Sequence, residues 1–151
     1  MESIIRLLAI IFVAISPFGM VLCHGPEFSL SEYWNTPFQP AFILSNAMTS
    51  YFFFSMSLWR VPSFFLMLLT GFSVAMYPDI HNILATIFFI SCAIALYKSH
   101  RFKYYLYIYI AMTLIMPISM LWGEILTIMV LCAYHSHLIL YKWYLDNRNK
   151  L

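Results

Sequence analysis

Three ionisable residues at the edges of, or inside, long apolar runs are the candidates for chemistry: His81, Glu124 and His135. Such groups are costly in apolar surroundings, so they mark a binding site, a proton-transfer site or an interhelical hydrogen bond. Glu124 and His135 lie 11 positions apart, from 124 to 135. On a helix this spacing returns to within about 20° of the same face, about 16 Å further along. We therefore expect the two residues to mark two depths of one polar groove.

Smaller polar residues accompany these candidates. Ser45 and Thr49, like Asn46 and Ser50, are spaced by four residues within one apolar segment, which places each pair on one helix face. Their ordinary role is hydrogen bonding between helices, and Ser45 is also a candidate contact for a lipid. Asp79 precedes His81 where a helix is expected to begin, and we predict that it caps that helix.

Motifs of known catalytic, metal or cofactor centres are absent from the sequence. It contains no HExxH, no GxSxG and no glycine-rich phosphate loop, and its three cysteines show no CxxC spacing. The net charge of +2 provides no strong basic field for nucleic acid. We therefore predict no metal, no cofactor and no nucleic-acid partner, and the sequence favours a role other than catalysis.

The elements that position these residues must lie in a membrane. The 151-residue chain is 63% hydrophobic and only 9% charged, whereas soluble domains carry roughly 25% charged residues. A fold with so few charges has no surface suited to water. The composition predicts an all-α, polytopic transmembrane bundle that forms a single domain over residues 1–151, in a membrane that the sequence does not identify.

Apolar segments of about the length needed to cross a bilayer divide the chain into six predicted spans. The first two are separated by a loop over residues 24–40, and the second and third turn at Trp59 and Arg60, with Pro62 in the first turn of the third. Pro117 is expected to kink the fifth span. The predicted spans cover residues 4–22, 41–58, 61–77, 82–97, 104–122 and 125–143.

The charges orient this bundle. Cytoplasmic loops are enriched in Lys and Arg, and with both termini in the cytoplasm all eight basic residues fall on that side. They are Arg6, Arg60, Lys98, Arg101, Lys103, Lys142, Arg148 and Lys150. The first segment is interpreted as a retained helix, because Pro17 follows the best signal-peptide cleavage site, Ala14-Ile15-Ser16. The 24–40 loop is then an ordered cap on the outer face.

Short motifs on the second, fourth and sixth segments resemble those of a known family. The second contains Ser45 and ends at Trp59-Arg60, the fourth begins at His81 and continues into aromatics, and the sixth begins at Glu124 and reaches Tyr134-His135. This order is similar to the FRAG/DRAM/Sfk superfamily of six-span membrane proteins, and within it to the post-GPI-attachment factor two group. Pro40 and Ser45-Asn46 also fit the opening of seven-span ceramidase-like hydrolases, but the metal-binding histidines and aspartate of those enzymes do not appear at a matching spacing here.

The resemblance implies recognition or remodelling of a lipid or GPI-type glycolipid in the outer or luminal leaflet. In this interpretation His81 and Glu124 bind a head group, with His135 below them beside an acyl chain, and Arg60 anchors the cytoplasmic turn. Two alternatives stay open. The chain can instead be a structural or regulatory subunit of a larger membrane complex, or an intramembrane hydrolase or acyltransferase in which Ser45, His81 or His135 converges with a carboxylate.

Overall fold

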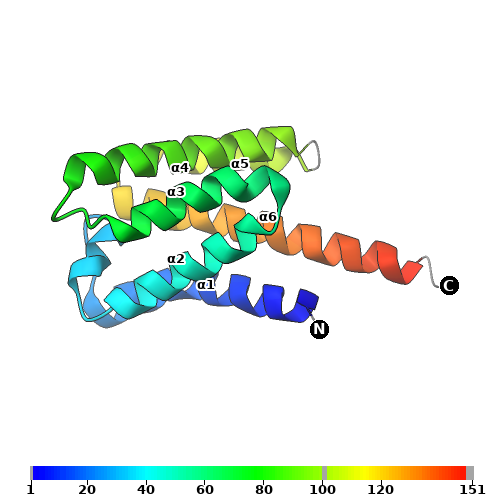
Figure 1. The fold of residues 1–151 in the computed structure, drawn as a ribbon, viewed down its shortest axis with the longest axis horizontal. Helices are drawn as coiled ribbons and strands as arrows, with labels where there is room; N and C mark the ends of the chain where they lie inside the picture. The colour runs from blue at the N-terminus through cyan, green and yellow to red at the C-terminus, as the bar shows by residue number, and fades with distance from the viewer. Residues whose placement is uncertain (1, 100–101, 149–151) are drawn as a thin grey trace.

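The computed structural model of the chain describes residues 2–99 and 102–148, and these form an all-α bundle. Two short 3-10 helices, η1 and η2, join the α-helices (Figure 1). The elements in chain order are α1 (Glu2–His24), η1 (Leu30–Asn35), α2 (Gln39–Phe54), η2 (Ser57–Trp59), α3 (Arg60–Gly71), α4 (Pro78–Lys98), α5 (Tyr104–Thr113) and α6 (Met120–Arg148).

Three of these helices are long and apolar enough to cross a membrane: Ile4–His24, Pro78–Lys98 and Met120–Arg148. At about 1.5 Å per residue, a 21-residue helix spans the roughly 30 Å hydrocarbon core. The chain is therefore a multi-pass membrane protein. Helices α2, α3 and α5 have only 16, 12 and 10 residues, so they do not reach that length individually.

Successive helices reverse direction along one long axis (Figure 1). The cap with η1, the α3–α4 loop and the α5–α6 turn lie at one end, which we call the cap end, and the N-terminus and the far end of α6 lie at the other. Helix α1 packs against α2 and α6, α3 against α2 and α4, and α5 against α6. The last turns of α6 extend beyond the other helices (Figure 1).

The predicted hairpin at Trp59-Arg60 is confirmed. Helix α2 ends at Phe54, η2 makes the turn, and α3 begins at Arg60 with Pro62 in its first turn, where a missing N–H is harmless. Trp59 is buried against Phe53, with ring centroids 4.8 Å apart. The third helix ends at Gly71, six residues before the predicted limit at 77.

The predicted fifth span over 104–122 is wrong in its second half. Helix α5 ends at Thr113, and residues 114–118 form a tight turn with hydrogen bonds between residues three apart, such as Met116 N–H to Thr113 O. Pro117 has no N–H and disfavours helical backbone at the residue before it. It therefore ends the helix instead of kinking it, and residues 120–122 belong to α6.

The cap predicted for Asp79 is also wrong. Helix α4 begins at Pro78, its N-cap residue is Tyr77, and no side chain caps it. Asp79 lies in the first turn, where a carboxylate is favoured by the helix dipole. Proline at the first position explains the shift, because its ring fixes a helical φ there. Two residues of the predicted charge pattern, Arg101 and Lys150, lie outside the described residues.

Candidate functional site

The cap is attached to the bundle by Glu124. Its Oε2 atom accepts a hydrogen bond of 2.7 Å from the backbone N–H of Leu30, the first residue of η1. Ser29 is in the N-cap position but makes no capping hydrogen bond through its side chain. Glu124, 94 residues away in sequence, therefore supplies the acceptor that the start of η1 lacks. The Glu124 side chain is buried.

His81 makes the second attachment. Its Nδ1 lies 2.6 Å from the carbonyl oxygen of Phe72, and its Nε2 lies 2.7 Å from Oγ of Ser31. A carbonyl only accepts hydrogen bonds, so Nδ1 carries the proton and the Ser31 hydroxyl donates to Nε2 in the neutral ring. His81 thus joins the cap to the α3–α4 loop, and His81 and Glu124 hold the adjacent residues Ser31 and Leu30.

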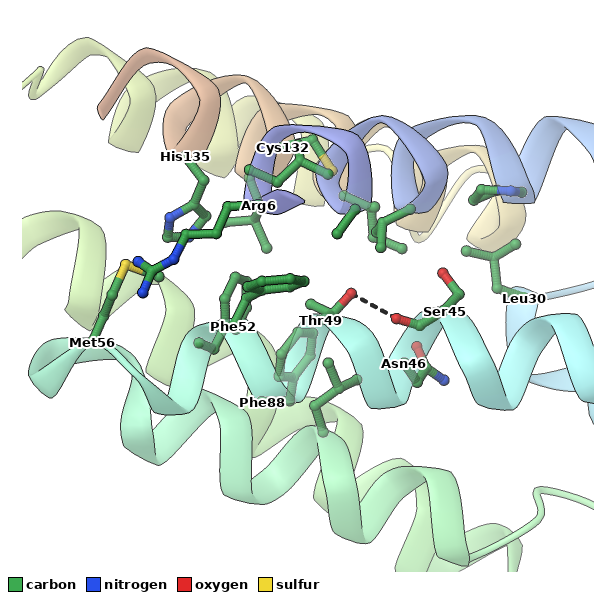
Figure 2. Close-up of a pocket in the computed structure, with 18 of the residues that line it drawn as sticks. Arg6, Leu30, Ser45, Asn46, Thr49, Phe52, Met56, Phe88, Cys132 and His135 are labelled. Atoms are coloured by element: carbon green, nitrogen blue, oxygen red, sulfur yellow. Dashed lines mark hydrogen bonds between the residues drawn. The ribbon is translucent and has the colours of Figure 1, made fainter. Parts of the chain in front are cut away.

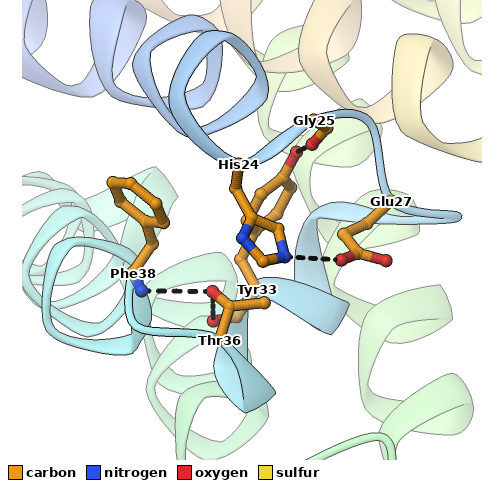
Figure 3. Close-up of polar contacts among 6 residues, drawn as sticks. All are labelled: His24, Gly25, Glu27, Tyr33, Thr36 and Phe38. Carbon is orange, nitrogen blue, oxygen red and sulfur yellow. Dashed lines mark hydrogen bonds and ion pairs between the residues drawn. The ribbon is translucent and has the colours of Figure 1, made fainter.

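Local hydrogen bonds make the cap itself an ordered structure, as predicted for the 24–40 loop (Figure 3). The Tyr33 hydroxyl donates to Gly25 O at 2.5 Å, and Thr36 Oγ1 donates to Tyr33 O at 2.9 Å. His24 Nε2 lies 3.0 Å from a carboxylate oxygen of Glu27. Tyr33 is fully buried, and this burial raises the pKa of its hydroxyl.

A cavity of about 110 Å³ lies below the cap, mainly between α1, α2 and α6. It is lined by Leu30 at the cap end and by Arg6, Met56 and His135 at the opposite end (Figure 2). Its remaining walls are largely apolar, with Ala9 and Val13 from α1 and Phe52 from α2 among them. The arrangement is a long apolar groove that is closed by the cap and has polar groups at the far end.

Three polar residues of α2 line the middle of this cavity: Ser45, Asn46 and Thr49. Ser45 Oγ lies 3.0 Å from Ser16 Oγ of α1, and Thr49 Oγ1 donates to Ser45 O at 2.8 Å. The contact with Ser16 confirms the predicted helix–helix hydrogen bond for Ser45, whereas the Thr49 bond lies within α2. In the described parts of the chain no hydrogen bond joins Ser45 to a histidine or carboxylate, so the geometry supplies no activated nucleophile there.

His135 lines the cavity at the end opposite the cap, and its side chain is only 5% exposed. Its ring packs against Trp59 and Phe53, with centroids 4.4 and 4.8 Å away. Its Nε2 atom is buried and has no hydrogen-bond partner. Buried polar atoms are almost always paired, so this nitrogen requires an explanation.

The structure divides the predicted site in two. His81 and Glu124 bond to adjacent residues of the cap and do not line the cavity, whereas His135 and Ser45 do. Trp59 packs on His135, and the exposed Arg60 lies over the Phe54 ring at 5.9 Å. No group of three potential metal ligands occurs within residues 2–99 and 102–148.

Sequence reasoning did not select Arg6 as a site residue, although it lines the cavity. The sequence marked Arg6 only as a cytoplasmic charge. A lone cation at the start of an apolar helix is typical of membrane proteins, so the sequence offered no signal that this one faces a cavity.

Comparison of the chain with protein-family models, curated proteins and solved structures found no match. The similarity to the FRAG/DRAM/Sfk superfamily therefore stays a prediction.

Proposed function

We propose that this protein binds a membrane lipid by holding part of one acyl chain in the cavity between α1, α2 and α6. The observation that carries the proposal is the cavity itself: a long, mostly apolar space inside a bundle surrounded by lipid. An empty apolar space forfeits dispersion contacts, and water is held only where it finds several polar partners. A volume of about 110 Å³ is below the roughly 150 Å³ of an apolar cavity that holds one benzene, so it takes a short stretch of one alkyl chain.

The proposal gives His81 and Glu124 a different role from the head-group contact that the sequence predicts. Both ring nitrogens of His81 are already hydrogen-bonded, Nε2 to Ser31 of the cap and Nδ1 to Phe72 O of the α3–α4 loop, and one oxygen of Glu124 holds Leu30 of the cap. In this proposal they keep Leu30 over one end of the cavity. A role in remodelling a GPI-type glycolipid of the outer leaflet would require the cap to open, and no contact described above supports that finer assignment.

The proposal includes six membrane crossings with both termini in the cytoplasm. Its support is the alternating direction of the helices and the position of the described basic residues at the end opposite the cap. Exposed Cys23 then lies on the outer side. A membrane-impermeant maleimide added to intact cells should label Cys23 and not a Cys23→Ser variant, and protection of Cys23 would contradict this orientation.

The lipid-binding proposal is tested by filling the cavity. Ala9 of α1 is buried and lines the cavity, whereas Ala47 of α2 is exposed on the outside of the bundle. Ala9→Phe should remove a co-purifying lipid, and Ala47→Phe should retain it. Native mass spectrometry of each protein, extracted gently from its own membrane, measures the bound lipid.

Equal lipid retention by the two variants would reject the proposal, provided both elute and melt as folded proteins. A stoichiometric protein partner bound to a lipid-free wild type would also reject it, and would favour the alternative of a subunit in a larger complex.

A further inference from the structure

We propose that the cavity takes a single-chain acidic lipid whose oxyanion is bound by Arg6 and His135, with the alkyl chain running toward Leu30. The inference rests on the proposed function and adds the class of head group and its position. The shared chemistry is a carboxylate or a phosphate monoester on one alkyl chain.

The first support is the unpaired Nε2 of His135. The side chain is 5% exposed, lines the cavity, and is fixed on two sides by the rings of Phe53 and Trp59. A buried nitrogen without a partner loses its hydrogen bond to water and gains none in return. A ligand atom in the cavity restores that bond, and with Nε2 protonated the ring donates to an oxyanion.

The second support is Arg6, which among residues 2–99 and 102–148 is the one Lys, Arg, Asp or Glu side chain that lines the cavity. Figure 2 shows Arg6 and His135 at the same end of the cavity, with Leu30 at the other. A guanidinium binds carboxylates and phosphates through paired N–H donors. Two donors of different geometry therefore face one end of a mostly apolar channel.

The third support is the shape of the cavity, which sets the orientation of the bound lipid and the number of alkyl chains that fit. Leu30 closes the cap end and is held there by Glu124, so the head group has no polar partner at that end. The space of about 110 Å³ is smaller than the roughly 150 Å³ apolar cavity that takes one benzene, so it holds a short stretch of one chain and excludes a second.

The position of these donors also places the head group in the membrane. His135 lies 15 residues after the start of α6 at Met120, which is about 22 Å along the helix axis. Arg6 lies in the second turn of α1, at the end that carries the described basic residues. The oxyanion thus lies near the membrane–water boundary on the side of the two termini. There the flexible arginine side chain reaches polar surroundings.

The test is binding of radiolabelled palmitic acid, its methyl ester and 1-palmitoyl lysophosphatidate to the full chain in phosphatidylcholine nanodiscs. Arg6→Gln removes the charge, and His135→Phe removes the nitrogen while keeping an aromatic ring between Phe53 and Trp59. Arg60→Gln is the matched control, because Arg60 is a basic residue at the same end of the bundle but outside the cavity.

We expect an acidic probe to bind about tenfold or more tightly than the ester, the size of one charge-assisted hydrogen bond. Each cavity variant should remove most of that preference, leave ester binding unchanged, and differ from Arg60→Gln. The tighter of the two acidic probes identifies the oxyanion as carboxylate or phosphate. Equal binding of acids and ester would overturn the head-group assignment alone, and binding of no probe would overturn the acyl-chain proposal as well.

Discussion

At the scale of single residues, Glu124 shows how one carboxylate organises a distant loop. It accepts the Leu30 N–H at 2.7 Å and is buried where η1 meets α6. The sequence predicted Glu124 as a polar residue near a helix start, but not its partner. A backbone N–H leaves no mark in a sequence, so a bond across 94 residues is visible only in the fold.

Glu124→Ala should destabilise the protein by about 1–3 kcal/mol, because the buried Leu30 N–H loses its acceptor. Glu124→Gln keeps a carbonyl oxygen at the same place and should retain most of the stability. Thermal unfolding in detergent measures both changes, and limited proteolysis between residues 25 and 38 reports whether the cap loosens. Equal behaviour of the two variants would show that the Leu30 hydrogen bond is not what holds the cap.

His135 and Arg6 illustrate the limit of prediction for the cavity. The periodicity placed Glu124 and His135 on one face of the last helix, and both are buried. They nevertheless face different neighbours: Glu124 faces the cap, and His135 faces the cavity between α1, α2 and α6. A helix as long as α6 passes several partners along its length, and the sequence of α6 does not identify which partner lies at which depth.

At the scale of elements, the turn between α5 and α6 depends on Gly123. A Cβ atom at Gly123 would lie 2.6 Å from Cγ, 2.7 Å from N and 2.8 Å from Cα of Met116. Two of those atoms belong to the backbone and cannot move aside. The close approach lets the residues around Pro117 turn directly onto the first turns of α6, which the prediction of one helix over 104–122 did not foresee.

Gly123→Ala should therefore destabilise the protein by about 1–3 kcal/mol through overpacking against Met116. Gly19→Ala is the matched control, since nothing lies within 4 Å of its added Cβ in α1. There the loss of backbone freedom in the unfolded chain favours alanine by about 0.5–1 kcal/mol. In thermal unfolding, Gly123→Ala should lower the melting temperature and Gly19→Ala should raise it. An unchanged melting temperature for Gly123→Ala would show that the turn relaxes to accept the methyl group.

At the scale of the whole molecule, composition and charge predicted the fold class well. The low charge content and long apolar runs identified a helical membrane bundle, and the structure contains three helices of spanning length. The end of α5 could not be delimited, because apolar composition continues through the turn at 114–118, whereas Arg60 and Pro62 marked the turn between α2 and α3. In a membrane protein a turn beside other helices can be as apolar as a helix, so hydropathy does not mark its ends.

The central claim is that an acyl chain occupies the space between α1, α2 and α6. Photo-crosslinking tests it most directly, with palmitic acid and phosphatidylcholine that each carry a diazirine in mid-chain, incorporated into nanodiscs with the full chain. Adducts mapped by peptide mass spectrometry should fall on cavity-lining residues such as Ile10, Phe52 and Leu131 for at least one probe. Adducts confined to outward-facing residues such as Leu44, Ile83 and Ile94 would show that lipid only surrounds the bundle, and would contradict the account.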